Sequence, residues 1–234
     1  MSLVIELPMP RIRRDSMPIE MALALRRSVR SFVREPITIE DLSQLLWACY
    51  GVSDPVRGFL TCPSAGATFP LEIYAVIYPG SVLFGDTFLE PGSYRYDPHT
   101  HSIEMVKRGD LRYDLFRACV SQEWVREALL SVVIAAVFER TTSYYGERGY
   151  RYVYFEAGHA AQNLYLEATA LGLGAVAIGA FYDDEVAEVV GVERRARPIY
   201  IVSIGRPRRP RSVSEEEIAS YIRSRRGLAQ RARR

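Results

Sequence analysis

Apolar residues recur three and four positions apart between Thr38 and Gly51, a spacing that predicts an amphipathic helix. Thr38 and Asp41 form a capping box at the start of this helix, and Gly51 supplies its stop. A first helix is predicted from Asp15 or Ser16 to about Val29, since either side chain can cap it. Further helices are predicted over residues 111–130, 150–171 and 183–190, and after a second capping box at Ser214 and Glu217.

Short apolar or alternating runs, bounded by turn residues, predict the strands. These runs are Leu71 to Tyr78, Ser93 to Tyr96, Ser102 to Val106, Ser131 to Phe138, Ala175 to Ile178 and Pro198 to Ile204. The helices do not alternate with the strands as β-α-β units, so we expect one α+β domain and no doubly wound sheet. The expected divisions are an N-terminal extension (1–16), the domain (17–211) and a basic C-terminal helix or tail (212–234).

The composition excludes several classes of protein. The 234 residues are 48% hydrophobic and carry a net charge of only +2, which gives no global field for nucleic acid. Three cysteines are an odd number at wide spacing, and His99 and His101 lie far from His159, so neither disulfides nor a metal site is expected. No apolar run reaches about 18 residues, and the first ten residues lack the pattern of a signal peptide. A cytoplasmic protein is expected.

Two segments could bind an anionic, planar ligand. Arg26 to Arg30 (Arg-Arg-Ser-Val-Arg) can surround a phosphate monoester with charge-assisted hydrogen bonds, although a solvated basic helix end would explain it as well. Cys62 to Pro70 is rich in small residues that allow close approach to a flat ring, although an ordinary loop has the same composition. Each segment alone therefore leaves both interpretations open.

Two further segments follow the long helix. Gly172 to Gly179 contains several glycines, but a helix precedes it and a strand follows, which is the reverse of the dinucleotide-binding arrangement. Arg206, Arg208, Arg209 and Arg211 follow the last strand and can reach a phosphate or remain a solvated tail. The position of Arg206 beside Gly205 at the strand end favours a binding role for that residue.

The order and spacing of these four segments resemble those of the nitroreductase family of FMN enzymes, over roughly residues 17–208. The similarity is greatest to the thiazoline/oxazoline dehydrogenases, the branch that makes azole rings in modified peptides. The segments that carry this similarity are Pro63-Ser64-Ala65-Gly66-Ala67, Pro70 to Tyr74, Tyr94 to Pro98, Glu147 to Tyr152 and Glu156 to Leu164. The resemblance implies a nitroreductase-like α+β fold, with a mostly antiparallel sheet flanked by helices and a C-terminal arm.

The resemblance also implies a role for each residue. Arg26, Arg27 and Ser28 would bind the FMN phosphate, completed by Arg206 and Arg208, and Arg30 would face the flavin N1/O2 edge. Ile178 and Gly179 would lie near N5, the atom that accepts hydride. Family members are homodimers with FMN at the subunit interface, so the other subunit would supply a second group: Pro63, Ser64, Ala65 and Ala67.

Two departures from the family pattern bear on the chemistry. Ala67 stands where many nitroreductases have Asn, and Tyr144-Tyr145 stands where the azole-forming branch has Lys-Tyr. Tyr145 keeps a phenol that could act in catalysis, but an ordinary phenol with a pKa of about 10 is a poor base. Both tyrosines could equally have a packing or stacking role.

Three hypotheses follow. The first is an FMN-dependent oxidoreductase that passes hydride from NAD(P)H to a small acceptor. The second is a thiazoline or oxazoline dehydrogenase acting on a peptide. The third is a non-catalytic flavin-binding or nucleic-acid-binding protein that uses the arginine-rich arm; the balanced charge makes a nucleic-acid partner unlikely.

Overall fold

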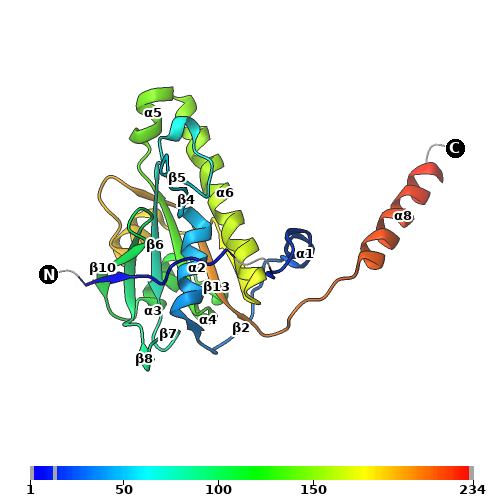
Figure 1. Cartoon of the computed structure of the whole chain (residues 1–234), viewed down its shortest axis with the longest axis horizontal. Helices are drawn as coiled ribbons and strands as arrows, with labels where there is room; N and C mark the ends of the chain where they lie inside the picture. The colour runs from blue at the N-terminus through cyan, green and yellow to red at the C-terminus, as the bar shows by residue number, and fades with distance from the viewer. Residues whose placement is uncertain (1–2, 13–14, 232–234) are drawn as a thin grey trace.

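A computed structural model of the protein describes residues 3–12 and 15–231. An eight-stranded sheet crosses the domain in the order β1-β10-β9-β6-β11-β13-β12, and β2 is added to β13 (Figure 1). The strands are β1 (Val4–Glu6), β2 (Phe32–Val33), β6 (Leu71–Ile77), β9 (Gly92–Asp97), β10 (Ser102–Arg108), β11 (Leu130–Ala136), β12 (Gly174–Ile178) and β13 (Arg197–Pro207). Their pairings are antiparallel, so the expected α+β domain with an antiparallel central sheet is confirmed.

Helices cover both faces of the sheet. They are α1 (Ile19–Leu25), α2 (Ile39–Tyr50), α3 (Arg112–Ala118), α4 (Glu123–Glu127), α5 (Glu139–Tyr145), α6 (Arg148–Ala170), α7 (Asp183–Val190) and α8 (Glu215–Arg231). Buried side chains of α2 and α6 join one core, whereas α3, α4 and α7 contribute to a second core on the other face. Helix α8 stands clear of the domain at the end of an extended segment (Figure 1).

The central strands are apolar on both faces because each face meets a core. In β6, Ile73, Ala75 and Ile77 point into the core shared with α2 and α6, whereas Tyr74 and Val76 point into the other. Side chains alternate between the faces of a strand, and this strand is buried at nearly every position. A continuous apolar run is therefore the expected pattern for a central strand covered twice.

Several short strands and one 3-10 turn lie outside the central sheet. The segment that the sequence marks as a loop, 51–70, contains a two-stranded sheet and a single 3-10 turn. The short elements of the chain are β3 (Ile37–Thr38), β4 (Val52–Asp54), β5 (Phe59–Leu60), η1 (Ala65–Ala67), β7 (Val82–Phe84) and β8 (Thr87–Phe88). The predicted capping box is present, since Asp41 N donates to Thr38 Oγ1 and Thr38 N donates to Asp41 Oδ2, both at 3.2 Å.

Two predicted helices differ from the structure. The first helix begins after Pro18 and ends at Leu25, although it was expected to run from Asp15 or Ser16 to Val29. It stops early because the Val29 N–H donates to the carbonyl of Ala175 in β12, at 2.8 Å. The stretch predicted as one helix over 111–130 is divided into α3 and α4 by positive φ angles at the residues between them.

A buried histidine holds the N-terminal segment against the domain. His101 Nε2 lies 2.8 Å from Ser43 Oγ and 3.0 Å from the carbonyl oxygen of Pro8, and Nδ1 lies 2.9 Å from Tyr96 Oη. Burial lowers the pKa of His101, although the bond to Pro8 opposes the shift. The neutral ring therefore joins α2, the β9–β10 hairpin and the segment that follows β1.

We predict that this histidine makes the folded protein acid-sensitive. Its folded pKa lies below the ordinary 6.5, so the unfolded chain binds the proton first and stability falls as the pH drops through 6.5 and below. The loss approaches about 1.4 kcal/mol for each pKa unit of the difference. Urea unfolding of wild type and His101→Asn, a residue that tolerates the positive φ at this position, should show a shallower loss between pH 7 and pH 5 in the variant. Equal slopes would contradict the prediction.

Candidate functional site

The basic segment Arg26 to Arg30 lies beyond α1 in extended chain, beside the edge strand β12. Arg26 is the C-cap of α1, with an extended ψ of 126°. Ser28 forms a parallel bridge with Ala175, and the Val29 N–H donates to the Ala175 carbonyl. Residues 28–30 therefore lie outside the helix, whereas Arg26 and Arg27 remain at its C-terminal end, where Arg27 Nη1 donates to the Ala24 carbonyl at 3.4 Å. The segment is an addition to the sheet edge and presents its side chains from a fixed backbone.

Tyr165 on α6 connects this segment to β12. Its hydroxyl lies 3.1 Å from Ser28 Oγ and accepts the Ala177 N–H at 2.6 Å. The guanidinium of Arg26 lies over the Tyr165 ring, 5.2 Å from its centroid, a cation–π arrangement. Tyr165 thus orients two residues expected to bind phosphate, and its part in the candidate site has no signal in the sequence analysis.

Arg27 and Arg30 differ in how they are held. Arg27 donates to the carbonyl of Arg26 at 2.5 Å and is an exposed side chain. The guanidinium of Arg30 lies 5.4 Å from the ring centroid of Trp124 on α4, and the indole Nε1 of Trp124 is buried with no hydrogen-bond acceptor among the described residues. Arg30 therefore lies against α4, whereas Arg26 lies against α6.

Arg206 and Arg208 join the same region through β2. Arg206 pairs with Val33 in the sheet, and its guanidinium lies 3.5 Å from Glu35 and donates to the Pro36 carbonyl at 3.3 Å. The atom that faces Glu35 is Nε, which is buried and has no aligned hydrogen-bond acceptor among the described residues, so Glu35 partly balances the charge of this guanidinium. Arg208 instead donates to two acceptors of the adjacent chain, Ser31 Oγ at 3.1 Å and Phe32 O at 3.0 Å.

The end of β12 lies in the same neighbourhood. Ile178 is buried and pairs with Ile201, whereas Gly179 is exposed. A Cβ added at Gly179 would meet nothing within 4 Å, so a flat molecule can approach its backbone closely. The carbonyl of Ala180 is held by Gln122 Nε2 at 2.9 Å, which fixes the turn after the strand.

The segment Pro63 to Ala67 forms a rigid turn at the other end of α6. Gly66 and Ala67 have positive φ angles of 61° and 53°, and Ser64 Oγ accepts the Phe69 N–H at 2.9 Å. The Ser64 hydroxyl is therefore engaged within the turn. Pro63, Gly66 and Ala67 remain exposed.

The buried carboxyl group of Glu156 on α6 supports this turn through a hydrogen bond from Ser64. The Tyr50 hydroxyl donates to Glu156 Oε1 at 2.5 Å. Burial raises the pKa of Glu156, against the hydrogen bonds from Tyr50 and Ser64, and raises the pKa of the neighbouring Cys62 to about 12. Cys62 is therefore a neutral thiol near pH 7, and the cluster is a structural support with no activated nucleophile.

Within one chain, the two predicted groups of flavin-binding residues lie apart from each other. Ser64 contacts α6 at Glu156, whereas Ser28 contacts it at Tyr165. Nine residues of α-helix separate those two contacts, which is about 14 Å along the axis. The structure thus brings Arg26 and Ser28 together at Tyr165. Gly179 lies four residues beyond Ala175, the partner of Ser28, which is about 13 Å along β12, and Pro63 to Ala67 lie outside this group.

Tyr145 belongs to the region around Pro63 to Ala67. A Cβ added to Gly66 would lie 2.6 Å from Tyr145 Oη, and the Tyr145 ring stacks edge-on against Tyr144 and Tyr152. Thr141 Oγ1 on α5 lies 2.8 Å from Thr68 Oγ1. These contacts place the Tyr145 hydroxyl beside the turn and away from Arg26.

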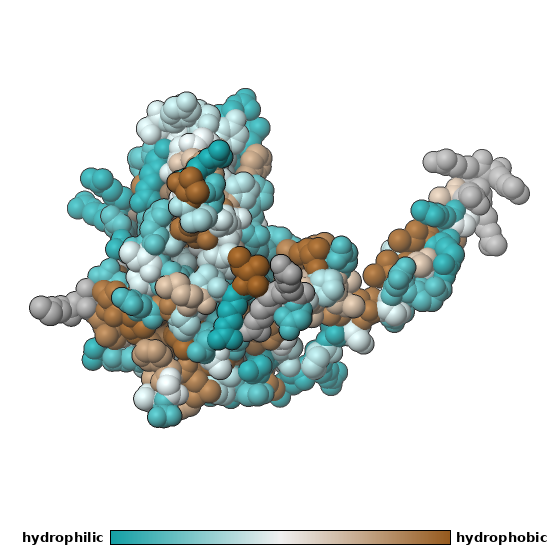
Figure 2. Space-filling model, in the orientation of Figure 1, coloured by the Kyte–Doolittle hydropathy of each residue, from teal (hydrophilic) through white to brown (hydrophobic). Residues whose placement is uncertain are grey.

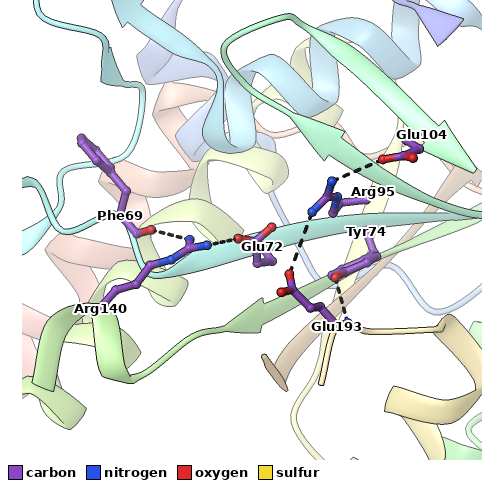
Figure 3. A network of polar contacts seen from close by, with 7 residues as sticks. All are labelled: Phe69, Glu72, Tyr74, Arg95, Glu104, Arg140 and Glu193. Atoms are coloured by element: carbon purple, nitrogen blue, oxygen red, sulfur yellow. Dashed lines mark hydrogen bonds and ion pairs between the residues drawn. The ribbon is translucent and has the colours of Figure 1, made fainter. Parts of the chain in front are cut away.

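An ion pair fastens α5 to the sheet near this tyrosine. Figure 3 shows Arg140 bonded to the carbonyl of Phe69 at 3.0 Å and to Glu72 at 2.5 Å. Arg95 of β9 bridges Glu104 and Glu193 on the adjoining part of the sheet (Figure 3). The N-terminal end of α5 is therefore bound to β6, and Tyr145 lies at the other end of this helix.

The described residues include no cluster of three or more histidine, cysteine or acidic side chains that could hold a metal ion. Among the helices that the structure describes, none combines the length and the apolar character needed to cross a membrane.

The fold is that of the nitroreductase family. The chain belongs to the nitroreductase family, whose model matches residues 23–206. It is 43% identical over 201 residues to MJ1384 of Methanocaldococcus jannaschii, provisionally named a nitroreductase, covering 86% of this chain and 96% of that protein. A crystal structure of a protein from Ralstonia eutropha JMP134, likewise provisionally named, superposes with a TM-score of 0.75 at 32% identity, covering 88% and 90% of the two chains.

More distant relatives include peptide-processing proteins. The microcin B17-processing protein McbC of Escherichia coli is 24% identical over 164 residues, which are 69% of this chain and 59% of McbC. The E. coli McbBCD complex, with truncated pro-MccB17 bound, has the same fold at a TM-score of 0.65 and 21% identity, over 87% and 71% of the chains. The NADPH:FMN oxidoreductase of Vibrio harveyi, complexed with NAD⁺, shares the fold at 0.58 and 17%, over 89% and 85%.

We predict that Tyr165 holds the site together. Tyr165→Phe removes the acceptor of the Ala177 N–H and the partner of Ser28, and an unsatisfied buried donor costs about 1–3 kcal/mol. Urea denaturation should show that loss of unfolding free energy. Tyr221→Phe, on the exposed arm helix, is the control and should match wild type. A Tyr165→Phe protein as stable as wild type would show that the contact is not stabilising.

Proposed function

We propose that the protein is an FMN-dependent oxidoreductase that transfers hydride from NAD(P)H to a small acceptor. The observation that carries this proposal is the pairing of Ser28 and Val29 with Ala175 of β12, the strand after which the exposed Gly179 follows. The name of the Vibrio harveyi relative, an NADPH:FMN oxidoreductase, supports the choice of cofactor and reductant.

The residues of the basic site fit a phosphate-bearing flavin. Arg26 and Ser28 are held by Tyr165, and the guanidinium of Arg206 adds positive charge that Glu35 partly balances. A phosphate monoester would supply acceptors to these donors. Arg208 would act indirectly, since it fixes the chain at Ser31 and Phe32.

Bound FMN would supply the two-electron chemistry that ordinary side chains lack. Arg30 would hold a positive charge near the pyrimidine edge of the ring, and its position over Trp124 limits how far it can move. Ile178 and Gly179 would present an open backbone edge to the flat ring. The role of these residues is to bind, orient and tune, so the reaction requires no nucleophile from the protein.

We further propose a homodimer with FMN at the subunit interface. Pro63 to Ala67 lies about 14 Å along α6 from the basic site of its own chain, so it is available to a second copy. The outer face of α6 suits such a contact because Tyr154 and Phe155 are exposed and a Cβ at Gly158 would meet nothing within 4 Å. Tyr145, which touches Gly66, would then act on the partner's flavin.

Dehydrogenation of a thiazoline or oxazoline in a peptide is a second candidate, favoured by the relationship to McbC. It requires a base that removes a proton from the ring. Lys107, the only lysine of the sequence, donates to the carbonyl of Glu188 at 2.8 Å, on the side of α7. No lysine accompanies Tyr145, so the transfer of hydride from NAD(P)H is the proposal that the site supports better.

Replacement of Arg26 and replacement of Arg30 should have different effects on bound FMN. Arg26→Ala removes a charge-assisted hydrogen bond worth about 1.5–3 kcal/mol, which weakens FMN binding roughly 10- to 100-fold. Arg30→Ala should keep the FMN and lower its reduction potential, because a positive charge that stabilises the reduced anion is lost. Titration of apoprotein with FMN and redox titration of the holoprotein measure the two effects. Arg117→Ala, an exposed arginine on α3, is the control. Undiminished FMN binding by Arg26→Ala would contradict the assignment.

A complementation experiment tests the shared site. We expect Arg26→Ala and Gly66→Val each to inactivate both sites of its own homodimer, the second because a side chain at Gly66 meets Tyr145. A heterodimer of the two variants, purified through two different tags, would contain one intact site and one with both defects, and so about half of the wild-type activity. If both residues served the same chain's site, the heterodimer would be inactive.

A further inference from the structure

Helix α5 carries Arg140 in its first turn and Tyr145 at its last residue. A helix of this length is not stable in water by itself, so its position depends on the contacts that it makes. The hydroxyl oxygens of Thr141 and Thr68 lie 2.8 Å apart, and Gly149 of α6 packs closely against the α5 backbone. These contacts join α5 to the turn and to α6, and the guanidinium of Arg140 adds a charged attachment to β6.

Arg140 binds two acceptors at once with its planar guanidinium. Nη1 donates to the Phe69 carbonyl at 3.0 Å, and Nη2 donates to Glu72 Oε1 at 2.5 Å (Figure 3). The Glu72 side chain is only 13% exposed, so this ion pair is less screened than one between two exposed side chains. A guanidinium holds both acceptors in a fixed geometry, whereas an ammonium group is a single point charge.

The Phe69 residue that Arg140 binds has an unfavourable backbone conformation. Its φ angle is 42°, in the left-handed region that a bulky side chain rarely adopts. Ser64 Oγ accepts the Phe69 N–H at 2.9 Å, and Arg140 binds the Phe69 carbonyl. Strained residues persist where the surrounding contacts fix them, and they are concentrated at functional sites. The turn is therefore held through Ser64 on one side and through Arg140 on the other.

The Tyr145 hydroxyl lies over the backbone of this turn. A Cβ added to Gly66 would be 2.6 Å from Tyr145 Oη, and Tyr152 of α6 holds the Tyr145 ring edge-on, with 5.1 Å between the ring centroids. The side chain is half-buried, and its hydroxyl has no hydrogen-bond partner within the described part of the chain. A hydroxyl with a fixed position and a free hydrogen is available to a ligand.

The surface at α5 suits a polar, flat molecule. Figure 2 shows mostly pale residues, of intermediate hydropathy, at the tip of the domain where α5 lies. The helix sequence Glu-Arg-Thr-Thr-Ser-Tyr-Tyr supplies hydroxyl groups and phenol rings there. Phenol rings stack on planar molecules and their hydroxyls form hydrogen bonds with polar atoms.

We propose that Arg140 is a positioning residue that holds the Tyr145 hydroxyl over Gly66, where it donates a hydrogen bond to a carbonyl oxygen of a quinone-like hydride acceptor. The inference rests on the proposed function, in which this turn lies at the flavin of the other subunit. The carbonyl oxygen gains negative charge as the hydride arrives, and a donor already fixed beside it stabilises that charge. The quinone takes up the hydride and a proton from water to become the hydroquinone, and Tyr145 keeps its own proton.

Reoxidation of the reduced FMN holoprotein tests the hydrogen bond. The flavin is reduced with dithionite and mixed in a stopped-flow instrument with menadione or with ferricyanide, which takes electrons without a hydrogen bond. Tyr145→Phe and Arg140→Ala should each slow reoxidation by menadione about 10-fold and leave reoxidation by ferricyanide unchanged. The double variant should be no slower than Tyr145→Phe, because Arg140 acts through that hydroxyl. Arg108→Ala, which breaks the ion pair of Arg108 with Glu90 on β10, is the matched control and should equal wild type.

A fluorine label reports the position of the ring without turnover. With 3-fluorotyrosine in place of Tyr145, the fluorine NMR signal should shift or broaden in Arg140→Ala, return toward the wild-type signal in Arg140→Lys, and stay unchanged in Arg108→Ala. An unchanged signal in Arg140→Ala would overturn the positioning role. Equal slowing with both oxidants, or additive effects in the double variant, would show a general structural role and overturn the proposal.

The same samples separate this proposal from the proposed function. Failure of NAD(P)H to reduce the bound flavin would contradict the proposed function alone, because dithionite still prepares the reduced protein. A protein that binds no FMN would overturn both the proposed function and the hydrogen bond to the acceptor, and the fluorine signal would still decide whether Arg140 positions Tyr145.

Discussion

The basic site depends on the pairing of the segment Ser28 to Val33 with the sheet. Val29 donates to Ala175 of β12, and Phe32 and Val33 pair with the end of β13. This pairing occupies backbone groups at the sheet edge that would otherwise face solvent or a neighbouring molecule. It also converts a sequence that would be mobile after a short helix into a fixed support for Arg26 and Arg30.

Two glycines make that pairing sterically possible. A Cβ at Gly174 would lie 2.7 Å from Val29 Cβ, and one at Gly205 would lie 3.0 Å from the ring of Phe32. A side chain at Gly174 would therefore push the segment away from β12. The glycines matter here for close packing between backbone and side chain, although the run Gly172 to Gly179 first suggests a phosphate-binding loop.

The secondary structure was predictable wherever local signals decide it. The capping box at Thr38 and the strand of β6 follow from patterns of a few residues, and α7 has the predicted bounds Asp183–Val190. The end of α1 was not predictable in this way. Its cause is a hydrogen bond from Val29 to Ala175, nearly 150 residues later in the chain, which competes successfully with continuation of the helix.

The same limit applies to the candidate site. The arginines and Ser28 are recognisable because their order along the chain resembles that of a family, but Tyr165 has no local signal and contacts Ser28 across 137 residues. The use of Ser64 Oγ within its own turn depends likewise on the fold. Sequence patterns therefore identify which side chains are available, whereas the fold decides which of them are already occupied.

Helix α6 sets the geometry on which the proposed shared site rests. Its N-terminal half supports the turn at Ser64 through the buried Glu156, and its C-terminal half supports Ser28 through Tyr165. Because an α-helix is rigid over this length, the two supports cannot approach each other within one chain. A second copy that packs against α6 can bring the turn of one subunit toward the basic segment of the other. The separation along one helix is thus the physical basis of the proposal that the site is shared between subunits, and in that arrangement Tyr145 accompanies the turn with which it is in contact.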